Sequence, residues 1–138
     1  MRYVVDASVA LKWVLPEPDA AKAIVLRDEF RSGIHQFLAH ETFAVEVAHA
    51  LTRAERRGIL PPPQALHRLR NILSTVQRLH RSLPLLPRAV ELSSLHRIGV
   101  YDCRYIALAE REQCALVTAD SRLASIGFTS VILLGNLP

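Results

Sequence analysis

The sequence has few cysteines and no long uncharged segment. Only two cysteines occur, Cys103 and Cys114, which is too few for a disulfide framework, and their spacing is not that of metal ligands. The longest uncharged run, residues 123–138, is too short and too rich in Gly, Ser and Pro to span a membrane. No signal segment is recognisable, so we expect a cytoplasmic protein.

Glycine-rich turns are also missing. No such turn follows a predicted strand, which excludes dinucleotide-binding and P-loop sites. A phosphatase of the haloacid dehalogenase type needs a second aspartate two residues after the first strand's Asp6, where Ser8 stands. A receiver domain needs a late lysine, but Lys22 is the last one. These common phosphate-handling folds are therefore discounted.

Basic residues are abundant and unevenly placed. The net charge is +4, and fifteen of the seventeen basic residues are arginine. Between Arg53 and Arg88 there are eight arginines and two histidines, with Glu55 as the only acid. This segment would attract a polyanion such as nucleic acid or an acidic partner. For a charge run alone, a solvated pair of helix faces is the preferred explanation.

Short apolar segments alternate with helical patterns along the chain. Strands are expected at residues 3–5, 34–39, 83–86, 115–118 and 130–134. Helices are expected at residues 7–14, 19–31, 41–58 (or from His40), about 63–80, 88–97, 102–113 and 120–125. This alternation predicts an α/β three-layer sandwich with a mostly parallel sheet. No repeat or linker divides the sequence, so we expect one domain over residues 1–138.

Acidic residues follow two of the predicted strands. Asp6 comes directly after the first strand, and Asp120 comes just after the strand at 115–118. Ligands of open parallel sheets bind beyond the carboxyl ends of the strands, so both acids are expected at one edge. Asp102 opens a helix in which Ile106 and Ala109 lie on nearly the same side, so its carboxylate follows the buried stripe.

A fourth acid, Glu46, lies at the border of the apolar stripe of its helix, on the same side as Arg53 and Arg57. Taken singly, each acid has an ordinary explanation: the three aspartates as helix caps, and Glu46 as an ion-pair partner of Arg53. Several carboxylates at one edge would repel each other unless a cation or shared proton offsets them. Mg²⁺ or Mn²⁺ is the usual answer, because carboxylates suit hard ions.

Such a site can bind a phosphodiester, supply a hydroxide nucleophile and stabilise the leaving oxygen. The segments that contain the four acids resemble, in order, the acidic blocks of PIN-domain proteins. The four segments are Val4–Val9 (VVDASV), Glu46–Leu51 (EVAHAL), Tyr101–Ala109 (YDCRYIALA) and Leu116–Leu123 (LVTADSRL). Their order and spacing are most similar to those of VapC-type toxins, and the resemblance covers essentially the whole chain.

The resemblance implies a five-stranded parallel sheet, an Mg²⁺- or Mn²⁺-dependent endoribonuclease, a homodimer, and a small VapB-like antitoxin as partner. Carried over by position, Asp6 and Asp102 would be the principal metal ligands. Glu46 and Asp120 would complete the acidic site, directly or through water. Thr118 would hydrogen-bond a carboxylate from the second shell, and Ser8 either assists in the same way or is simply a small residue in a tight turn.

The hypothesis is hydrolysis of RNA by metal-activated water, leaving 3′-hydroxyl and 5′-phosphate ends, since the six histidines show no pairing typical of metal-free ribonucleases. Arg53 and Arg57, and more loosely Arg68 and Arg70, are candidates to guide the RNA backbone. The alternative is a PIN-like module that binds RNA or a protein without cleaving it. The sequence does not identify the RNA.

Overall fold

The computed structural model describes residues 1–76 and 78–138. Its described strands form one parallel sheet in the order β3-β2-β1-β4-β5. Their bounds are β1 Arg2–Val5, β2 Gln36–His40, β3 Arg78–His80, β4 Ala115–Thr118 and β5 Val131–Leu133. The prediction of a five-stranded parallel sheet is therefore confirmed.

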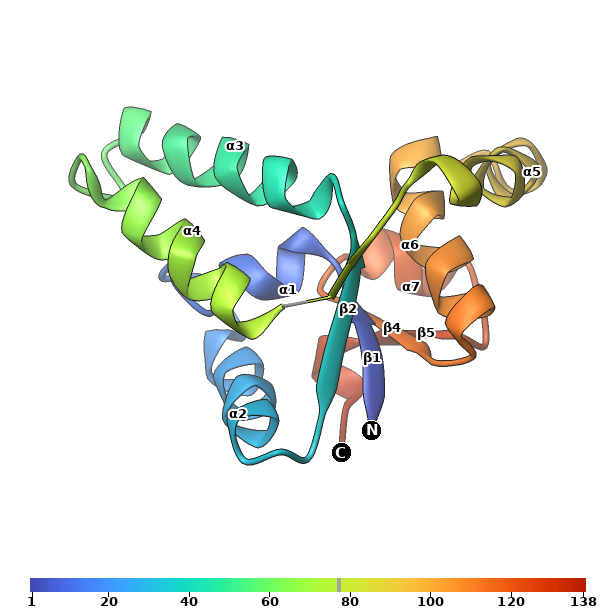
Figure 1. Cartoon of the computed structure of the whole chain (residues 1–138), viewed down its shortest axis with the longest axis horizontal. Coiled ribbons are helices and arrows are strands. Elements are labelled where there is room, and N and C mark those ends of the chain that lie inside the picture. The colour runs from blue at the N-terminus through green and yellow to red at the C-terminus, as the bar shows by residue number, and fades with distance from the viewer. Residues whose placement is uncertain (77) are drawn as a thin grey trace.

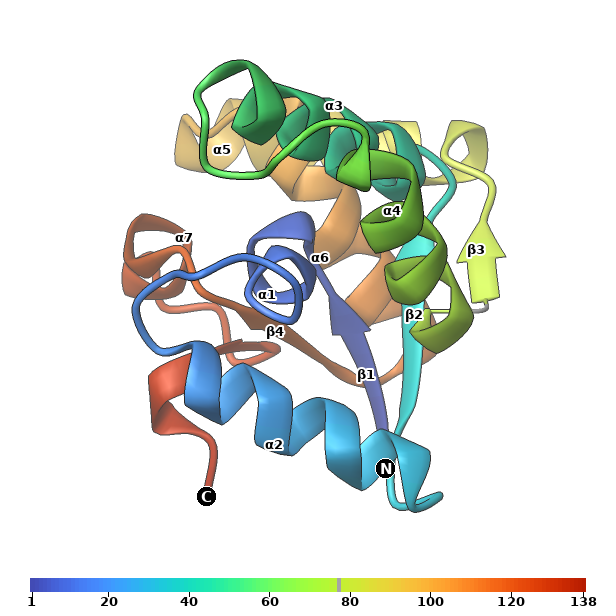
Figure 2. The ribbon, with the colours of Figure 1, turned by 90° about the vertical axis from the view of Figure 1, so that its left-hand side faces the viewer.

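Helices cover both faces of this sheet, which makes three layers (Figure 1, Figure 2). Their bounds are α1 Ala7–Leu11, α2 Ala20–Arg31, α3 Phe43–Arg56, α4 Gln64–Thr75, α5 Leu86–His96, α6 Val100–Glu112 and α7 Ser121–Ser125, with 3₁₀ turns η1 Leu83–Leu85 and η2 Leu134–Asn136. The pair α5 and α6 lies on one side of the sheet, and α1 to α4 lie on the other. The predicted α/β sandwich is confirmed.

The core lies between the central strands and the helices that cover them. Val4 and Val5 of β1 and Val117 of β4 are fully buried. Residues 103–109 of α6 are all buried, because the sheet covers this helix on one side and α5 on the other. This packing of α6 in the core fixes the position of its amino-terminal turn, which contains Asp102.

The prediction of the strand at residues 83–86 is wrong. Residues 83–85 form a 3₁₀ turn that leads into α5, because Pro84 and Pro87 stand in first turns, where the fixed φ of proline suits a helix. The third strand along the chain is instead β3, Arg78–His80, which lies within the helix that was predicted to extend to His80. That helix ends at Thr75, and Gln77, which the prediction also covered, lies outside the described residues.

The other helix boundaries differ from the predictions by a few residues. Asp19 precedes α2 as predicted, but its φ of 61° is left-handed and its side chain makes no capping hydrogen bond. The first turn of α3 begins at Phe43 rather than at residue 40 or 41. Within the described part of the chain, no helix is both long and apolar enough to cross a membrane.

Candidate active site

Asp6 and Asp120 come from neighbouring strands and lie at the same edge of the sheet. The strands β1 and β4 pair with Val5 opposite Val117, so the chain leaves both at one level. Each aspartate then caps a short helix: the Asp6 carboxylate accepts the Val9 N–H at 3.3 Å, and Asp120 caps α7. The explanation of these two acids as caps is therefore correct, and it does not exclude a second role.

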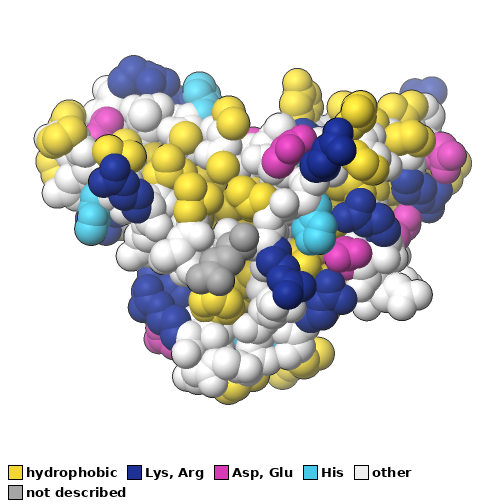
Figure 3. Space-filling model, viewed as in Figure 1, with side chains coloured by type: hydrophobic (Ala, Val, Ile, Leu, Met, Phe, Trp, Pro, Cys, Tyr) yellow, Lys and Arg dark blue, Asp and Glu magenta, His cyan; other side chains and the backbone are white. Residues whose placement is uncertain are grey.

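Glu46 and Asp102 stand in the first turns of α3 and α6. These helices lie on opposite sides of the sheet edge (Figure 1), and the molecule is hollowed between them (Figure 3). Burial raises the pKa of Asp6, Glu46 and Asp102 most, and the charge of Asp102 adds to the rise at Asp6 and Glu46, as the charge of Asp120 does at Asp102. The four predicted acids therefore interact electrostatically, with Asp102 at the centre.

Hydroxyl groups hold the Asp6 carboxylate in place. Ser8 donates to Oδ1 at 2.5 Å, and Thr118, which is fully buried, donates to Oδ2. Backbone N–H groups fix both hydroxyls in turn: Ala119 donates to Ser8 Oγ at 3.0 Å, and Asp120 donates to Thr118 Oγ1 at 3.1 Å. Both side chains therefore hydrogen-bond the Asp6 carboxylate, as the resemblance implies for Thr118 and as one of the two alternatives has it for Ser8.

Burial dominates the titration of Asp6. Loss of solvation raises its pKa from 3.8 to about 6, although the hydrogen bonds from Ser8, Thr118 and Val9 act to lower it, and the charge of Asp102 raises it further. A carboxylate that is costly to ionise when buried is one that a cation would stabilise.

Asp102 and Asp120 differ in their partners. Burial and the charge of Asp120 raise the pKa of Asp102. Among the described residues, Asp102 has no side-chain hydrogen bond or ion pair. Asp120 instead pairs with Arg122 at 3.1 Å, and this hydrogen-bonded guanidinium holds the pKa of Asp120 low. Asp102 therefore has the more available carboxylate.

Both oxygens of Glu46 are hydrogen-bonded by α6. Arg104 Nη2 donates to Oε1 at 3.1 Å, and the Tyr105 hydroxyl donates to Oε2 at 2.8 Å. Burial raises the pKa of Glu46, while Tyr105 and Arg104 act to lower it. The ion pair predicted between Glu46 and Arg53 is wrong, because Arg53 is exposed and Arg104 takes that place.

A buried histidine supports this arrangement from β2. Thr42 Oγ1 accepts from Arg104 at 2.5 Å and lies 2.8 Å from His40 Nδ1. Burial, with help from the charge of Arg104, lowers the pKa of His40 to about 3, so its ring is neutral. Thr42 Oγ1 therefore contacts both Arg104 and His40, while His40 Nε2 lies 3.9 Å from Glu46 Oε1 and has no hydrogen-bond partner among the described residues.

Sequence reasoning missed Arg104, Tyr105 and His40. A signal for Arg104 was present: it is the one charged residue in the otherwise apolar run 103–109. A charge in such a run needs a buried partner, and a glutamate bordering an apolar stripe is a fitting one. For His40 and Tyr105 no comparable signal exists, because buried histidines and tyrosines are ordinary core residues.

The donor chemistry of the cluster fits a hard divalent cation. Within residues 1–76 and 78–138, no group of three or more His, Cys, Asp or Glu side chains is arranged as a ready metal site. The carboxylate oxygens of Asp6 and Asp102 are nevertheless the ligands that Mg²⁺ and Mn²⁺ prefer, and Mg²⁺ commonly uses one or two carboxylates and several waters. Their mutual repulsion is what such an ion would offset.

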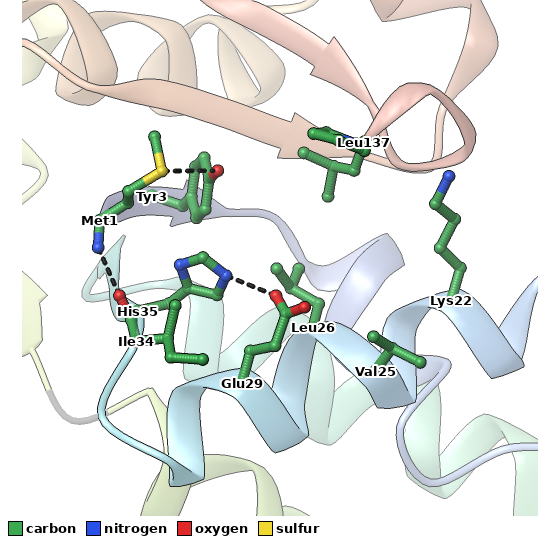
Figure 4. Close-up of a pocket in the computed structure, with 10 residues that line it drawn as sticks. Met1, Tyr3, Lys22, Val25, Leu26, Glu29, Ile34, His35 and Leu137 are labelled. Carbon is green, nitrogen blue, oxygen red and sulfur yellow. Dashed lines mark hydrogen bonds and ion pairs between the residues drawn. The ribbon is translucent and has the colours of Figure 1, made fainter.

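A pocket of about 250 Å³ lies at the opposite end of the sheet, where β1 and β2 begin (Figure 4). Its wall is mainly apolar, from residues such as Leu26 and Leu137. Its one carboxylate, Glu29, is paired with His35 at 2.6 Å. This pocket lacks the repelling acids of the other edge, so we do not place phosphodiester chemistry there.

The candidate RNA-guiding arginines lie outside the cluster. Arg53 and Arg57 are exposed near the carboxyl end of α3, about 10 and 16 Å along the helix axis from Glu46 at 1.5 Å per residue. No described contact brings Arg53 or Arg57 to the acids.

Both cysteines are free: Cys103 is buried in α6 and Cys114 follows it.

Comparison with known proteins identifies the family. The model of the PIN domain matches residues 3–129. Ribonuclease VapC3 of Pyrobaculum aerophilum is 32% identical over 126 residues, covering 90% of this chain and 93% of that protein. Ribonuclease VapC12 of Mycobacterium tuberculosis H37Rv is 37% identical over 122 residues, covering 88% of both.

Solved structures share the fold. The crystal structure of PAE2754 from Pyrobaculum aerophilum superposes with a TM-score of 0.73 at 22% identity, covering 98% of this chain and 93% of that one. VapBC2 from Rickettsia felis, bound to a DNA fragment from its promoter, gives a TM-score of 0.69 at 16% identity, covering 96% and 97%. Together with the match over residues 3–129, these comparisons show that the chain belongs to the PIN-domain family, among proteins named VapC ribonucleases.

Proposed function

We propose that this chain is an endoribonuclease that hydrolyses RNA phosphodiester bonds with Mg²⁺ or Mn²⁺, and that it is the toxin of a toxin–antitoxin pair. One observation carries the proposal: four carboxylates from four helix starts interact at one sheet edge, and one of them, Asp102, has no side-chain hydrogen bond or ion pair among the described residues. The names of the relatives support ribonuclease activity.

Each acid has a distinct part in the proposed site. Asp6, held by Ser8 and Thr118, and Asp102, with its available carboxylate, would hold the ion, and Asp120 and Glu46 would complete the negative site. When bound, the ion lowers the pKa of a water molecule and offsets the charge of the phosphodiester. The protein's part is to orient the carboxylates so that they converge on the ion and the scissile bond.

The partners proposed are RNA, a small VapB-like antitoxin and a second copy of this chain. A structural neighbour from Klebsiella pneumoniae is described as a toxin–antitoxin complex, which supports the second of these. The homodimer stays a prediction, as do the cytoplasmic location and the single domain over residues 1–138. Light scattering of the purified chain would report twice the chain mass if the homodimer forms.

Loss of either principal carboxylate should abolish cleavage. Asp6→Asn and Asp102→Asn each remove a charge at constant side-chain volume, so we expect a loss of at least about 10³-fold in cleavage rate with the fold retained. Cleavage of structured and unstructured RNAs, with circular dichroism on the same samples, measures this. The matched control is Asp28→Asn, because Asp28 is exposed on α2 and lies outside the cluster.

Wild-type cleavage by Asp6→Asn or Asp102→Asn, or cleavage that continues in EDTA, would overturn the proposed mechanism. A chain that binds RNA but cleaves none of the substrates with added Mg²⁺ or Mn²⁺ would instead be a PIN-like binding module.

A further inference from the structure

Arg104 is placed where a cation would otherwise neutralise Glu46. Its guanidinium is almost fully buried, with 7% of the side chain exposed, and it lies 3.1 Å from Glu46 Oε1. It also donates to Thr42 at 2.5 Å and lies 5.0 Å from the centre of the Tyr101 ring. These three contacts hold the guanidinium between α6 and the start of α3.

The remaining oxygen of Glu46 is also taken. The Tyr105 hydroxyl donates to Oε2 at 2.8 Å, and Tyr105 is 2% exposed and packs on His40 with ring centres 4.0 Å apart. Both donors come from buried side chains and cannot swing away without leaving packing contacts. An incoming metal ion would have to share either oxygen of Glu46 with a buried donor, and at Oε1 it would meet the positive charge of Arg104.

Asp6 and Asp102 offer a site that a cation can occupy at a lower cost in free energy. The Asp6 carboxylate accepts hydrogen bonds from hydroxyl and backbone N–H donors, and no arginine, lysine or histidine of residues 1–76 and 78–138 is paired with it. Among the described residues, Asp102 has no ion pair either. Of the four acids, Glu46 is paired with Arg104 and Asp120 with Arg122, whereas Asp6 and Asp102 form no ion pair with a described residue.

From this division, and resting on the proposed function, we infer that the site takes one divalent cation on the Asp6 and Asp102 side, and that Arg104 holds Glu46 off the metal. Arg104 is then a positioning residue that stands in for a second ion. Glu46 faces the site as a fixed acceptor, oriented for a water molecule or for the RNA.

Metal stoichiometry tests this inference without an activity assay. Mn²⁺ binding to the purified chain, measured by isothermal titration and by electron paramagnetic resonance, should give one ion per chain. In Arg104→Gln the released Glu46 should recruit a second ion. Arg104→Lys keeps the positive charge and should return the stoichiometry to one. Circular dichroism and the urea midpoint verify that each variant is folded.

A charge-balanced double variant tests whether Glu46 is a ligand. Glu46→Gln/Arg104→Gln removes the pair without changing net charge, so it should bind one Mn²⁺ with a Kd within about threefold of wild type. Asp102→Asn should weaken Kd by at least about a hundredfold. If the double variant loses affinity as Asp102→Asn does, Glu46 is a direct ligand and the inference fails.

The inference also fails if the wild type binds two ions, or if Arg104→Gln still binds only one. Cleavage by a wild type that binds two ions would leave the proposed function intact while overturning the inference. A wild type that neither binds Mn²⁺ nor cleaves RNA would overturn both.

Discussion

A buried carboxylate at the end of β1 carries an electrostatic cost in the metal-free protein. Asp6 is 6% exposed, and its pKa rises from 3.8 in the unfolded chain to about 6 in the folded one. Between these two values the folded protein keeps a proton that the unfolded chain has released. The free energy of unfolding therefore falls as pH rises through this window, by about 3 kcal/mol in total for Asp6.

Asp6→Asn should remove this pH dependence. In EDTA, the wild type should lose stability between pH 4 and 6.5 relative to the variant, and the two should differ most above pH 6, where Asp6→Asn is the more stable by about 1–3 kcal/mol. Urea unfolding of both proteins across this range gives the difference. Parallel pH profiles of the two proteins would show that Asp6 titrates normally in the folded state.

At the residue scale, the sequence pattern predicted where the acids lie but not which side chains hydrogen-bond them. Asp6 and Asp120 were predictable because a strand ends at each and parallel strands share an edge. Arg104, Tyr105 and His40 were not assigned, because their contacts with Glu46 join β2, α3 and α6, which only the folded chain brings together.

At the element scale, two short helices depend on site aspartates for their first turn. The Asp120 carboxylate accepts the Arg122 N–H at 2.9 Å and caps α7, while Asp102 in α6 is not a cap, because Gly99 holds that position. The sequence pattern treated all three aspartates alike. The structure separates them because α6 begins at Val100, two residues before Asp102.

Capping and charge can be separated at Asp120. Asp120→Ala should lower the free energy of unfolding by about 1 kcal/mol, whereas Asp120→Asn, which keeps an acceptor oxygen, should stay within about 0.5 kcal/mol of wild type. Urea unfolding at pH 7 in EDTA measures both. Equal destabilisation by the two variants would mean that the charge of Asp120, rather than its cap, stabilises α7.

Element boundaries were predictable where burial shapes the sequence. The apolar runs of β1 and β4 gave both strands nearly to the residue, since the sheet is covered on both faces. The edge strand β3 was missed because Arg78 and Leu79 are exposed and leave no apolar pattern. The segment that follows β3 along the chain contains Pro84 and Pro87, and it begins helical turns instead of the strand predicted at residues 83–86.

At the scale of the whole molecule, the acid edge is one pole of an uneven charge distribution. The net charge is +4, and the arginine-rich segment 53–88 includes the outer part of α3 and all of α4. These two helices form one hairpin, the arm, on one side of the hollow in Figure 3. A cluster of acids beside this positively charged arm suits a polyanion that binds along the arm and is cleaved at the acids.

The arm's contribution appears in the salt dependence of RNA binding. Arg53→Ala/Arg57→Ala should flatten the log–log slope of affinity against salt by about 0.7 for each lost phosphate contact on a single strand. Arg31→Ala, an exposed arginine on α2, is the control and should leave the slope unchanged. An unchanged slope in the double variant would assign Arg53 and Arg57 to solvation or to antitoxin binding.

We propose that the four acids at the end of the sheet support RNA cleavage only with a bound divalent cation. The direct measurement is a Mn²⁺ titration of the metal-free chain, in which cleavage rate and ion occupancy are followed in the same samples. We predict no cleavage at zero occupancy, a rate that rises in proportion to the bound ion, and neither binding nor cleavage in Asp102→Asn. Cleavage at full rate by the metal-free chain would contradict the account.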